Sequence, residues 1–305
     1  MKVVTAGKYI DIDVLSCAIA YSELFSLLNK ESKAVLEGYY TETITETIKS
    51  WNLNYVEKLP SNIDEFILVD VSDPNFLSNF VNFDKIKEVW DHRKGHEDFW
   101  IGKIGKHNIE IVGACATLIW EQFVKNNMQD KISKTSANLL YTAIFSNTLN
   151  FQAKISCERD KKAFEELELK IDLPKNWIDI YYKECAESII KDPLKSIKKG
   201  TKDVVIHNKK YKIGQLELGT INEFFKISNI DSIIKKSLET KEKDSFWFLT
   251  VPCVIEGFNY IFSESEETKK ILSEILDIKF ENNVAKTSKL ILRKEIMHLL
   301  YDKCE

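Results

Sequence analysis

Short apolar runs typical of β-strands alternate with longer helical stretches through the first half of the chain. The candidate strands are 2–6, 33–39, 66–71 and 86–90, and the candidate helices are 14–29, 43–51, 114–125 and 136–145. Strands that alternate with helices predict an α/β fold with a doubly wound parallel sheet. In such a sheet, functional side chains gather just beyond the carboxyl ends of the strands.

Acidic side chains follow three of these strands. Asp11 and Asp13 come after the first strand, Asp70 ends the third, and Asp91-His92 follows the fourth. A single carboxylate at a strand end is usually a helix N-cap or a turn former. Four carboxylates that meet at one edge beside an imidazole would repel one another unless cations neutralise them, which favours a metal site. Oxygen ligands with one imidazole suit Mn²⁺ or Mg²⁺ better than a structural zinc.

The composition excludes several classes of protein. A length of 305 residues allows two domains, and an apolar share of 44% without low-complexity runs argues against disorder. A formal net charge of −4 gives no reason to expect duplex nucleic acid or a membrane as a partner. Six cysteines without a CxxC pair, and a first segment without the apolar core of a signal peptide, predict a cytoplasmic protein.

The second half of the chain differs in character from the first. It begins after a helical stretch at 177–191, and an alternating segment at 204–218 predicts a hairpin with its turn at 208–210. Further strands are expected within 246–260 and 275–280. We expect the chain to divide into domains of 1–188 and 193–305.

Seven short motifs occur in one order along nearly the whole chain. Five are Gly7-Lys-Tyr-Ile-Asp11-Ile-Asp13, Leu68-Val69-Asp70, Asp91-His92-Arg93, Gly113-Ala-Cys-Ala116-Thr117 and Ser146-Asn147-Thr148, and two are Ile213-Gly214-Gln215-Leu216-Glu217 and Leu292-Arg293-Lys294. In this order they resemble the DHH phosphoesterase superfamily, in the branch of manganese-dependent (family II) inorganic pyrophosphatases, exopolyphosphatases and prune-type proteins.

The resemblance implies an architecture and an activity. The architecture is an N-terminal doubly wound parallel-sheet DHH domain and a smaller α/β C-terminal domain of the DHHA2 type, with the active site in the cleft between them. The activity is hydrolysis of phosphoanhydride bonds, in pyrophosphate or short inorganic polyphosphate, by a metal-activated water. The Gly-Gly-Gly-His motif of the superfamily's other accessory domain, which marks many nucleotide phosphodiesterases, has no counterpart in the sequence.

The resemblance also assigns roles to matching residues. Asp70 would bridge two Mn²⁺ or Mg²⁺ ions, Asp11 would hold one of them, and Asp13 with His92 would hold the other. Asn147 would add a neutral oxygen ligand where the family has an Asp. The expected catalytic residues are Asp70, Asp91 and Arg93, and the expected phosphate-binding residues are Arg93, Lys202, Arg293 and Lys294. Arg93 offers a planar fork to phosphate oxygens but cannot donate a proton as a general acid.

Three positions depart from the family pattern. Gly7 stands where pyrophosphatases have a metal-binding His, Arg93 replaces the second His of Asp-His-His, and Asn147 replaces an Asp. Gly7 and Asn147 predict weaker metal binding, with one tightly held ion and a second that arrives with substrate. Gly7 and Arg93 favour polyphosphate or a nucleotide-derived substrate over pyrophosphate alone.

Two alternatives stay open at this level. One is a degenerate member that binds a phosphorylated ligand or partner without turnover, and the other is a small-nucleotide phosphodiesterase. The resemblance also raises a homodimer, which no residue of the sequence decides.

Overall fold

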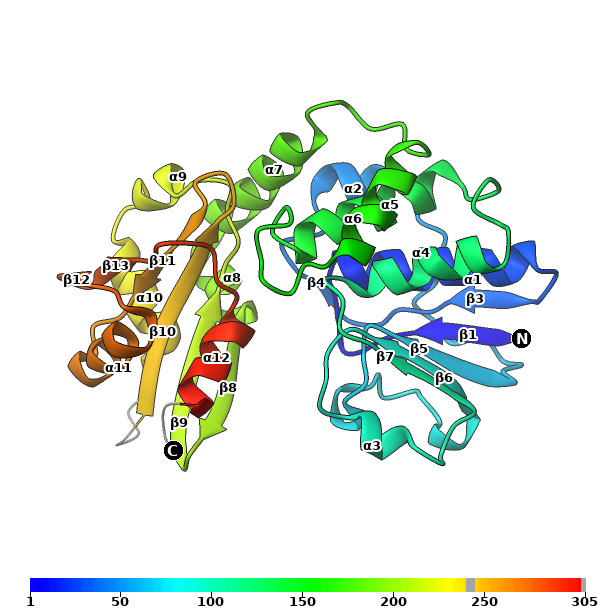
Figure 1. The fold of residues 1–305 in the computed structure, drawn as a ribbon, viewed down its shortest axis with the longest axis horizontal. Helices are drawn as coiled ribbons and strands as arrows, with labels where there is room; N and C mark the ends of the chain where they lie inside the picture. Colours follow the sequence, from blue (N-terminus) through cyan, green and yellow to red (C-terminus); the bar gives the residue numbers. More distant parts are fainter. Residues whose placement is uncertain (240–244, 303–305) are drawn as a thin grey trace. The chain divides into compact units, whose positions relative to one another are not determined.

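The computed structural model describes residues 1–239 and 245–302, in two compact units, Met1–Ile178 and Asp179–Glu305 (Figure 1). The expected boundary at 188–193 falls at the end of helix α7 (Trp177–Lys191). Most of this helix belongs to the second unit, where Ile189 is buried in the core. In the part of the chain that the structure describes, no helix is both long and apolar enough to cross a membrane.

The first unit is built on a five-stranded sheet in the order β3-β1-β5-β6-β7. Its strands are β1 (Lys2–Thr5), β3 (Ser32–Ala34), β5 (Glu65–Val69), β6 (Ile86–Asp91) and β7 (Lys106–Ile109). Every neighbouring pair is parallel, so the parallel sheet predicted from the alternation is confirmed. The strand order reverses between β1 and β5, and ligands of such sheets bind at the carboxyl ends beside this reversal.

Helices cover the sheet of the first unit (Figure 1). They are α1 (Ile12–Leu27), α2 (Glu46–Ser50), α3 (Glu97–Trp100), α4 (Cys115–Lys125), α5 (Lys134–Asn147) and α6 (Glu158–Glu168). A two-stranded sheet, β2 (Tyr9–Ile10) with β4 (Tyr39–Tyr40), and two 3-10 turns, Pro74–Phe76 and Phe83–Lys85, complete the unit. Helix α1 is apolar on nearly every side because it packs against the sheet, α4 and α5 at once.

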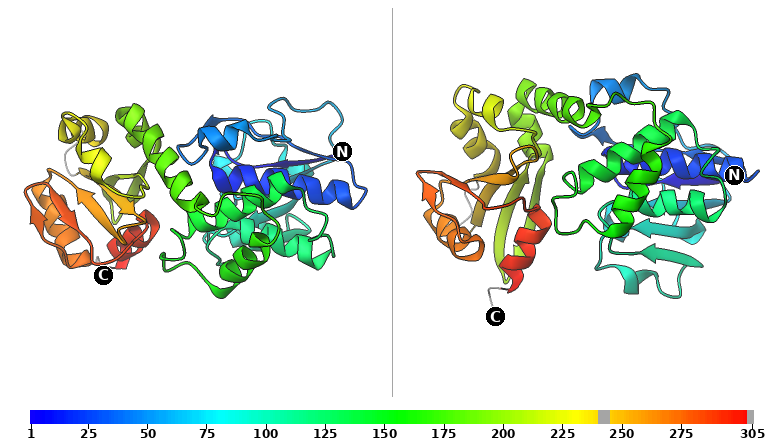
Figure 2. Two further views of the ribbon diagram at one scale, coloured as in Figure 1. Left: turned by 90° about the horizontal axis from the view of Figure 1, so that it is seen from above. Right: turned by 45° about the horizontal axis from the view of Figure 1, so that its top comes forward.

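The second unit contains a six-stranded mixed sheet in the order β12-β13-β11-β10-β9-β8. Its strands are β8 (Thr201–Ile206), β9 (Lys209–Gln215), β10 (Ser245–Cys253), β11 (Phe258–Phe262), β12 (Phe280–Glu281) and β13 (Val284–Lys286). Its further helices are α8 (Pro193–Lys199), α9 (Asn222–Phe225), α10 (Ile230–Leu238), α11 (Glu266–Leu276) and α12 (Arg293–Asp302). Figure 2 shows the sheet with α9 and α10 (yellow) on one face, and α11 and α12 (orange and red) on the other.

The alternation of β10 explains why this sheet is covered on both faces. Trp247 and Leu249 lie in the core cluster that includes residues of α8 and α10, whereas Phe246 and Phe248 lie in the cluster with α11 and α12. Successive side chains of a strand point to opposite faces, so a continuous apolar run needs two covering layers.

Two local expectations for the second unit need correction. The predicted hairpin is confirmed as β8–β9, but its turn is His207-Asn208, with φ of 47° and 62°, rather than 208–210. Two successive left-handed residues match the twist of hairpin strands, and Asn tolerates this conformation. The strand expected within 275–280 is wrong, because α11 continues to Leu276 and β12 begins only at Phe280.

Candidate metal centre

Three side chains that the sequence predicts as metal ligands come together: Asp13 in the first turn of α1, Asp70 directly after β5 and His92 directly after β6. Potential ligand atoms of Asp13, Asp70 and His92 all lie within 4.8 Å of one another. Nε2 of His92 is 3.5 Å from Oδ1 of Asp70 and 3.9 Å from Oδ2 of Asp13. The three residues are only 1%, 4% and 8% exposed, respectively. Two carboxylates and an imidazole in this arrangement can hold a divalent cation.

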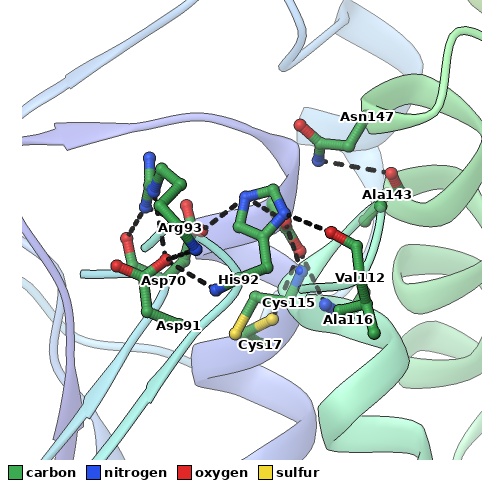
Figure 3. Close-up of polar contacts among 12 residues, drawn as sticks. Cys17, Asp70, Asp91, His92, Arg93, Val112, Cys115, Ala116, Ala143 and Asn147 are labelled. Carbon is green, nitrogen blue, oxygen red and sulfur yellow. Dashed lines mark hydrogen bonds and ion pairs between the residues drawn. The ribbon is translucent and has the colours of Figure 1, made fainter. Parts of the chain in front are cut away.

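A backbone contact orients the His92 ring. Its Nδ1 lies 3.2 Å from the carbonyl oxygen of Val112 (Figure 3). Because a carbonyl only accepts, Nδ1 must carry the proton, and the lone pair of the neutral ring is then on Nε2. This tautomer directs a ligand nitrogen at Asp13 and Asp70, as metal-binding histidines require.

The first turn of α4 holds the Asp13 carboxylate. Its two oxygens accept the amides of Cys115 and Ala116, each at 2.8 Å, and the Cys17 thiol donates to Oδ1 at 3.4 Å. Burial nevertheless raises the pKa of Asp13 to about 7, with the nearby Asp11 carboxylate as the next cause. A buried carboxylate in this state is stabilised by a neighbouring cation, because the cation favours its charged form.

The motif Gly113-x-x-Ala116-Thr117 places these amides. The Gly113 amide and the Thr117 hydroxyl donate to the carboxylate of Asp160, at 2.8 and 2.6 Å. A Cβ at Gly113 would lie 2.4 Å from Cγ2 of Thr148, so only glycine fits. Sequence reasoning missed Asp160, although it stands at the third position of α6, where a carboxylate often bonds back to the cap residue.

Arg93 lies between two carboxylates of the centre rather than pointing away from it. Its Nη2 donates to Oδ1 of Asp70 at 2.8 Å and also to the Asp70 carbonyl, and its Nε donates to Oδ1 of Asp91 at 3.0 Å (Figure 3). Although burial acts to raise the pKa of Asp70 and carries it well above its usual range, Arg93 acts in the opposite direction.

Asp91 braces the turn that carries His92 and Arg93. Its Oδ1 accepts the backbone amides of both residues, at 2.7 and 3.2 Å, and its Oδ2 accepts the Ser72 hydroxyl at 2.6 Å. Burial alone would raise its pKa, but the Arg93 charge and the hydrogen bonds from Ser72 and Arg93 hold the pKa of Asp91 below its usual value. The Asp91 carboxylate is therefore charged and fully engaged in holding the site.

The other predicted ligands have local partners. Asp11 is the N-cap of α1, and its Oδ1 accepts the Val14 amide at 2.9 Å. Asn147 is the last residue of α5, and its amide nitrogen donates to the Ala143 carbonyl at 3.3 Å (Figure 3). Metal ligation by Asp11 and Asn147 stays a prediction.

Tyr9 is a neighbour that sequence reasoning missed. It lies in β2, and burial raises its pKa to about 12; the charges of Asp11 and Asp70 act in the same direction, and the charge of Arg93 acts against them. Its phenol is therefore neutral and hydrogen-bonds to Arg93. An aromatic residue in a two-residue strand carries no pattern that could have identified it.

The predicted phosphate ligands of the second unit lie on β8 and at the start of α12. Lys202 is in β8, and Arg293 with Lys294 opens α12. The Arg293 guanidinium donates to the carbonyls of Gly200 and Ile213, and its amide donates to Oε1 of Gln215. Arg293 thus joins α12 to the β8–β9 hairpin, a structural role that the sequence did not reveal.

Comparisons with known proteins match the whole chain to one group, although no family model matches it. A probable manganese-dependent inorganic pyrophosphatase of Listeria welshimeri is 23% identical over 297 residues, covering 96% of this chain and 95% of that protein. The manganese-dependent inorganic pyrophosphatase of Bacillus subtilis is 24% identical over 298 residues, covering 93% of this chain and 92% of that protein.

Two solved structures share the fold. A putative family II inorganic pyrophosphatase of Methanococcus jannaschii superposes with a TM-score of 0.71 at 18% identity, over 99% of both chains. An exopolyphosphatase-related protein of Bacteroides fragilis has a TM-score of 0.54 at 13% identity, over 99% of this chain and 92% of that one. The resemblance that the motifs predict is therefore confirmed over nearly the whole chain.

Proposed function

We propose that the chain is a metal-dependent phosphohydrolase that cleaves phosphoanhydride bonds, with pyrophosphate as the first candidate substrate. The observation that carries the proposal is the buried Asp13–Asp70–His92 cluster at the strand-order reversal of the sheet. The similar proteins of Listeria welshimeri and Bacillus subtilis are described as manganese-dependent inorganic pyrophosphatases, which favours Mn²⁺ as the ion and pyrophosphate as the substrate.

The residues present fit a divalent ion. Buried carboxylate oxygens and an imidazole nitrogen are ligands that Mn²⁺ accepts, and a cation beside Asp13 would oppose the burial and the Asp11 charge that raise its pKa. When bound, the ion supplies a Lewis acid for phosphate oxygens and lowers the pKa of a coordinated water.

The protein's own groups prepare the site for this ion. The amides of α4 fix Asp13, the Val112 carbonyl fixes the His92 tautomer, and Arg93 fixes the Asp70 carboxylate. Side chains held in place need no reorganisation when charge develops on the phosphate, which is where preorganised sites gain their rate. Phosphate contact by Lys202, Arg293 and Lys294 is part of the proposal.

The experiment measures phosphate release from pyrophosphate, tripolyphosphate and long polyphosphate, with Mn²⁺ or Mg²⁺. Asp70→Asn should lower release at least 100-fold, because it removes a ligand charge from the cluster. Asp73→Asn is the matched control, because Asp73 is only three residues along the chain but lies outside the cluster, where its carboxylate caps a 3-10 turn and pairs with His96 at 3.5 Å.

Each outcome separates the candidate functions. Release by the wild type and the control, but not by Asp70→Asn, supports the proposal, and the substrate ranking decides between pyrophosphate, which the similar proteins favour, and polyphosphate, which the departures at Gly7 and Arg93 favour. Absence of release from all three substrates would refute it and favour a phosphate-binding protein without turnover. Cleavage of a dinucleotide panel in that case would identify a phosphodiesterase. A cytoplasmic location and a homodimer stay predictions.

A further inference from the structure

We propose that Arg93 serves as a fixed cation of the centre, so that the protein without substrate holds one divalent ion rather than two. The inference deepens the proposed function, on which it rests, because it states how many ions the same site takes. It also changes the expected role of Arg93, from a phosphate ligand to a partner of the metal-site carboxylates.

Arg93 already neutralises two carboxylates of the centre. Its guanidinium bridges Asp70 and Asp91, with N–O distances of 2.8 and 3.0 Å. A guanidinium that donates to two buried carboxylates is fixed in position, and it stays charged at every pH at which the fold survives. Asp70 therefore has a permanent cationic partner before any ion binds.

The position of Asp70 carries the second step. Its Oδ1 contacts Nη2 of Arg93 at 2.8 Å and lies 3.5 Å from Nε2 of His92. The same carboxylate oxygen of Asp70 thus contacts the Arg93 guanidinium and faces the His92 imidazole. An ion held by Asp13, Asp70 and His92 would share the Asp70 carboxylate with Arg93, so Arg93 would occupy the oxygen that a second ion at Asp70 would need.

The residues around a second ion do not fit it. Gly7 offers no side-chain ligand, and the Phe76 carbonyl lies 3.0 Å from where a Cβ of residue 7 would be. Asp11 would be the remaining carboxylate, and its Oδ1 caps α1 through the Val14 amide. A second divalent ion beside Asp11 and Asp70 would also be repelled by the charge of Arg93.

The test counts bound ions without measuring catalysis. Equilibrium dialysis against Mn²⁺, with metal analysis, gives the number of ions per chain, and electron paramagnetic resonance distinguishes an isolated Mn²⁺ from an exchange-coupled pair. We expect one ion per chain and an isolated-ion spectrum at every loading of the wild type. Arg93→Gln should bind a second ion, at Mn²⁺ concentrations at least 10-fold below the highest at which the wild type still binds one, and Arg93→Lys should still bind one.

Arg159→Gln is the matched control. Arg159 also bridges two carboxylates of the first unit, Glu110 and Glu121, each at 2.6 Å, but these lie outside the metal cluster. Its loss should leave the ion count at one. A wild-type protein that binds two ions with a coupled spectrum would overturn the inference, even if the variants did not fold.

Two further outcomes separate the inference from the function. An affinity for the second ion that is unchanged in Arg93→Gln would overturn the role of Arg93. One bound ion without phosphate release from any substrate would support the inference and refute the proposed function. Two bound ions together with phosphate release would refute the inference and support the proposed function.

Discussion

Asp160 is a fully buried carboxylate that joins two helix starts in the first unit. Its Oδ2 accepts the amides of Gly113 and Cys157, each at 2.8 Å, and its Oδ1 accepts the Thr117 hydroxyl at 2.6 Å. Gly113 and Thr117 lie at the start of α4, and Cys157 is the N-cap of α6. Because the first amides of α4 bind Asp13, Asp160 supports the metal centre without contacting it.

The cost of removing this carboxylate follows from its three donors. Asp160→Ala leaves the buried donors of Gly113 and Thr117 and the half-buried amide of Cys157 without this acceptor, and at about 1–3 kcal/mol for each, moderated by relaxation and by water at Cys157, we expect a loss of about 3–6 kcal/mol. Asp160→Asn keeps the shape, since one oxygen can still accept both amides and the Thr117 hydroxyl can turn to accept. We expect that variant to lose about 1–2 kcal/mol, mainly the charge-assisted part of the hydrogen bonds.

Urea unfolding followed by tryptophan fluorescence measures both losses, because Trp90, Trp100 and Trp120 are buried in the first unit. Glu158→Ala is the control on the same helix, since the Glu158 side chain is 88% exposed, and it should change the unfolding free energy by less than about 0.5 kcal/mol. Mn²⁺ affinity should fall in Asp160→Ala and persist in Asp160→Asn. An alanine variant that loses less than about 1 kcal/mol, or an asparagine variant that loses as much as alanine, would refute the reasoning.

Three other changes have definite outcomes. In metal-free protein the folded pKa of Asp13 is raised from 3.8 to about 7, so its folded state retains a proton that the unfolded state releases. Stability relative to Asp13→Asn should therefore fall as pH rises from about 4 to 7, and Mn²⁺ should restore it, in urea titrations at each pH. Gly113→Ala should lower the unfolding free energy by about 1–3 kcal/mol through overpacking, whereas Gly105→Ala, whose Cβ would meet nothing within 4 Å, should not. Asn147→Asp should tighten Mn²⁺ binding at least 10-fold in equilibrium dialysis if residue 147 contributes an oxygen, and an unchanged affinity would exclude that role.

The centre could be predicted from the sequence because topology alone gathers its residues. Asp70 and His92 directly follow β5 and β6, Asp13 lies in the first turn of the helix that comes after β1 and β2, and a parallel sheet directs all carboxyl ends to one edge. The order of strands and helices is enough to place these residues together, whichever hydrogen bonds orient the side chains.

The supporting residues could not be predicted because their partners are distant in sequence. Asp160 bonds to Gly113 across 47 positions, and no local pattern at either residue identifies the other. Strand β7 was missed because Lys106–Ile109 is a mostly polar edge strand, and edge strands need not show apolar alternation. The conformer of Arg93 likewise depends on Asp70, whose left-handed backbone, with φ of 50°, has no sequence signature.

The charge balance of the centre connects its sequence pattern with its ion count. Four carboxylates at neighbouring strand ends need compensation, and the chain supplies part of it itself: Arg93 contacts two of them, and the amides at the start of α4 hold Asp13. The N-cap position likewise favours a negative charge at Asp11. One guanidinium and one divalent ion leave a single negative charge among the four, which these amide dipoles can stabilise. A second divalent ion would make the centre net positive, and this state becomes favourable only when a polyanionic phosphate enters. The predicted sequence of events, one ion held tightly and a second arriving with substrate, follows from this balance.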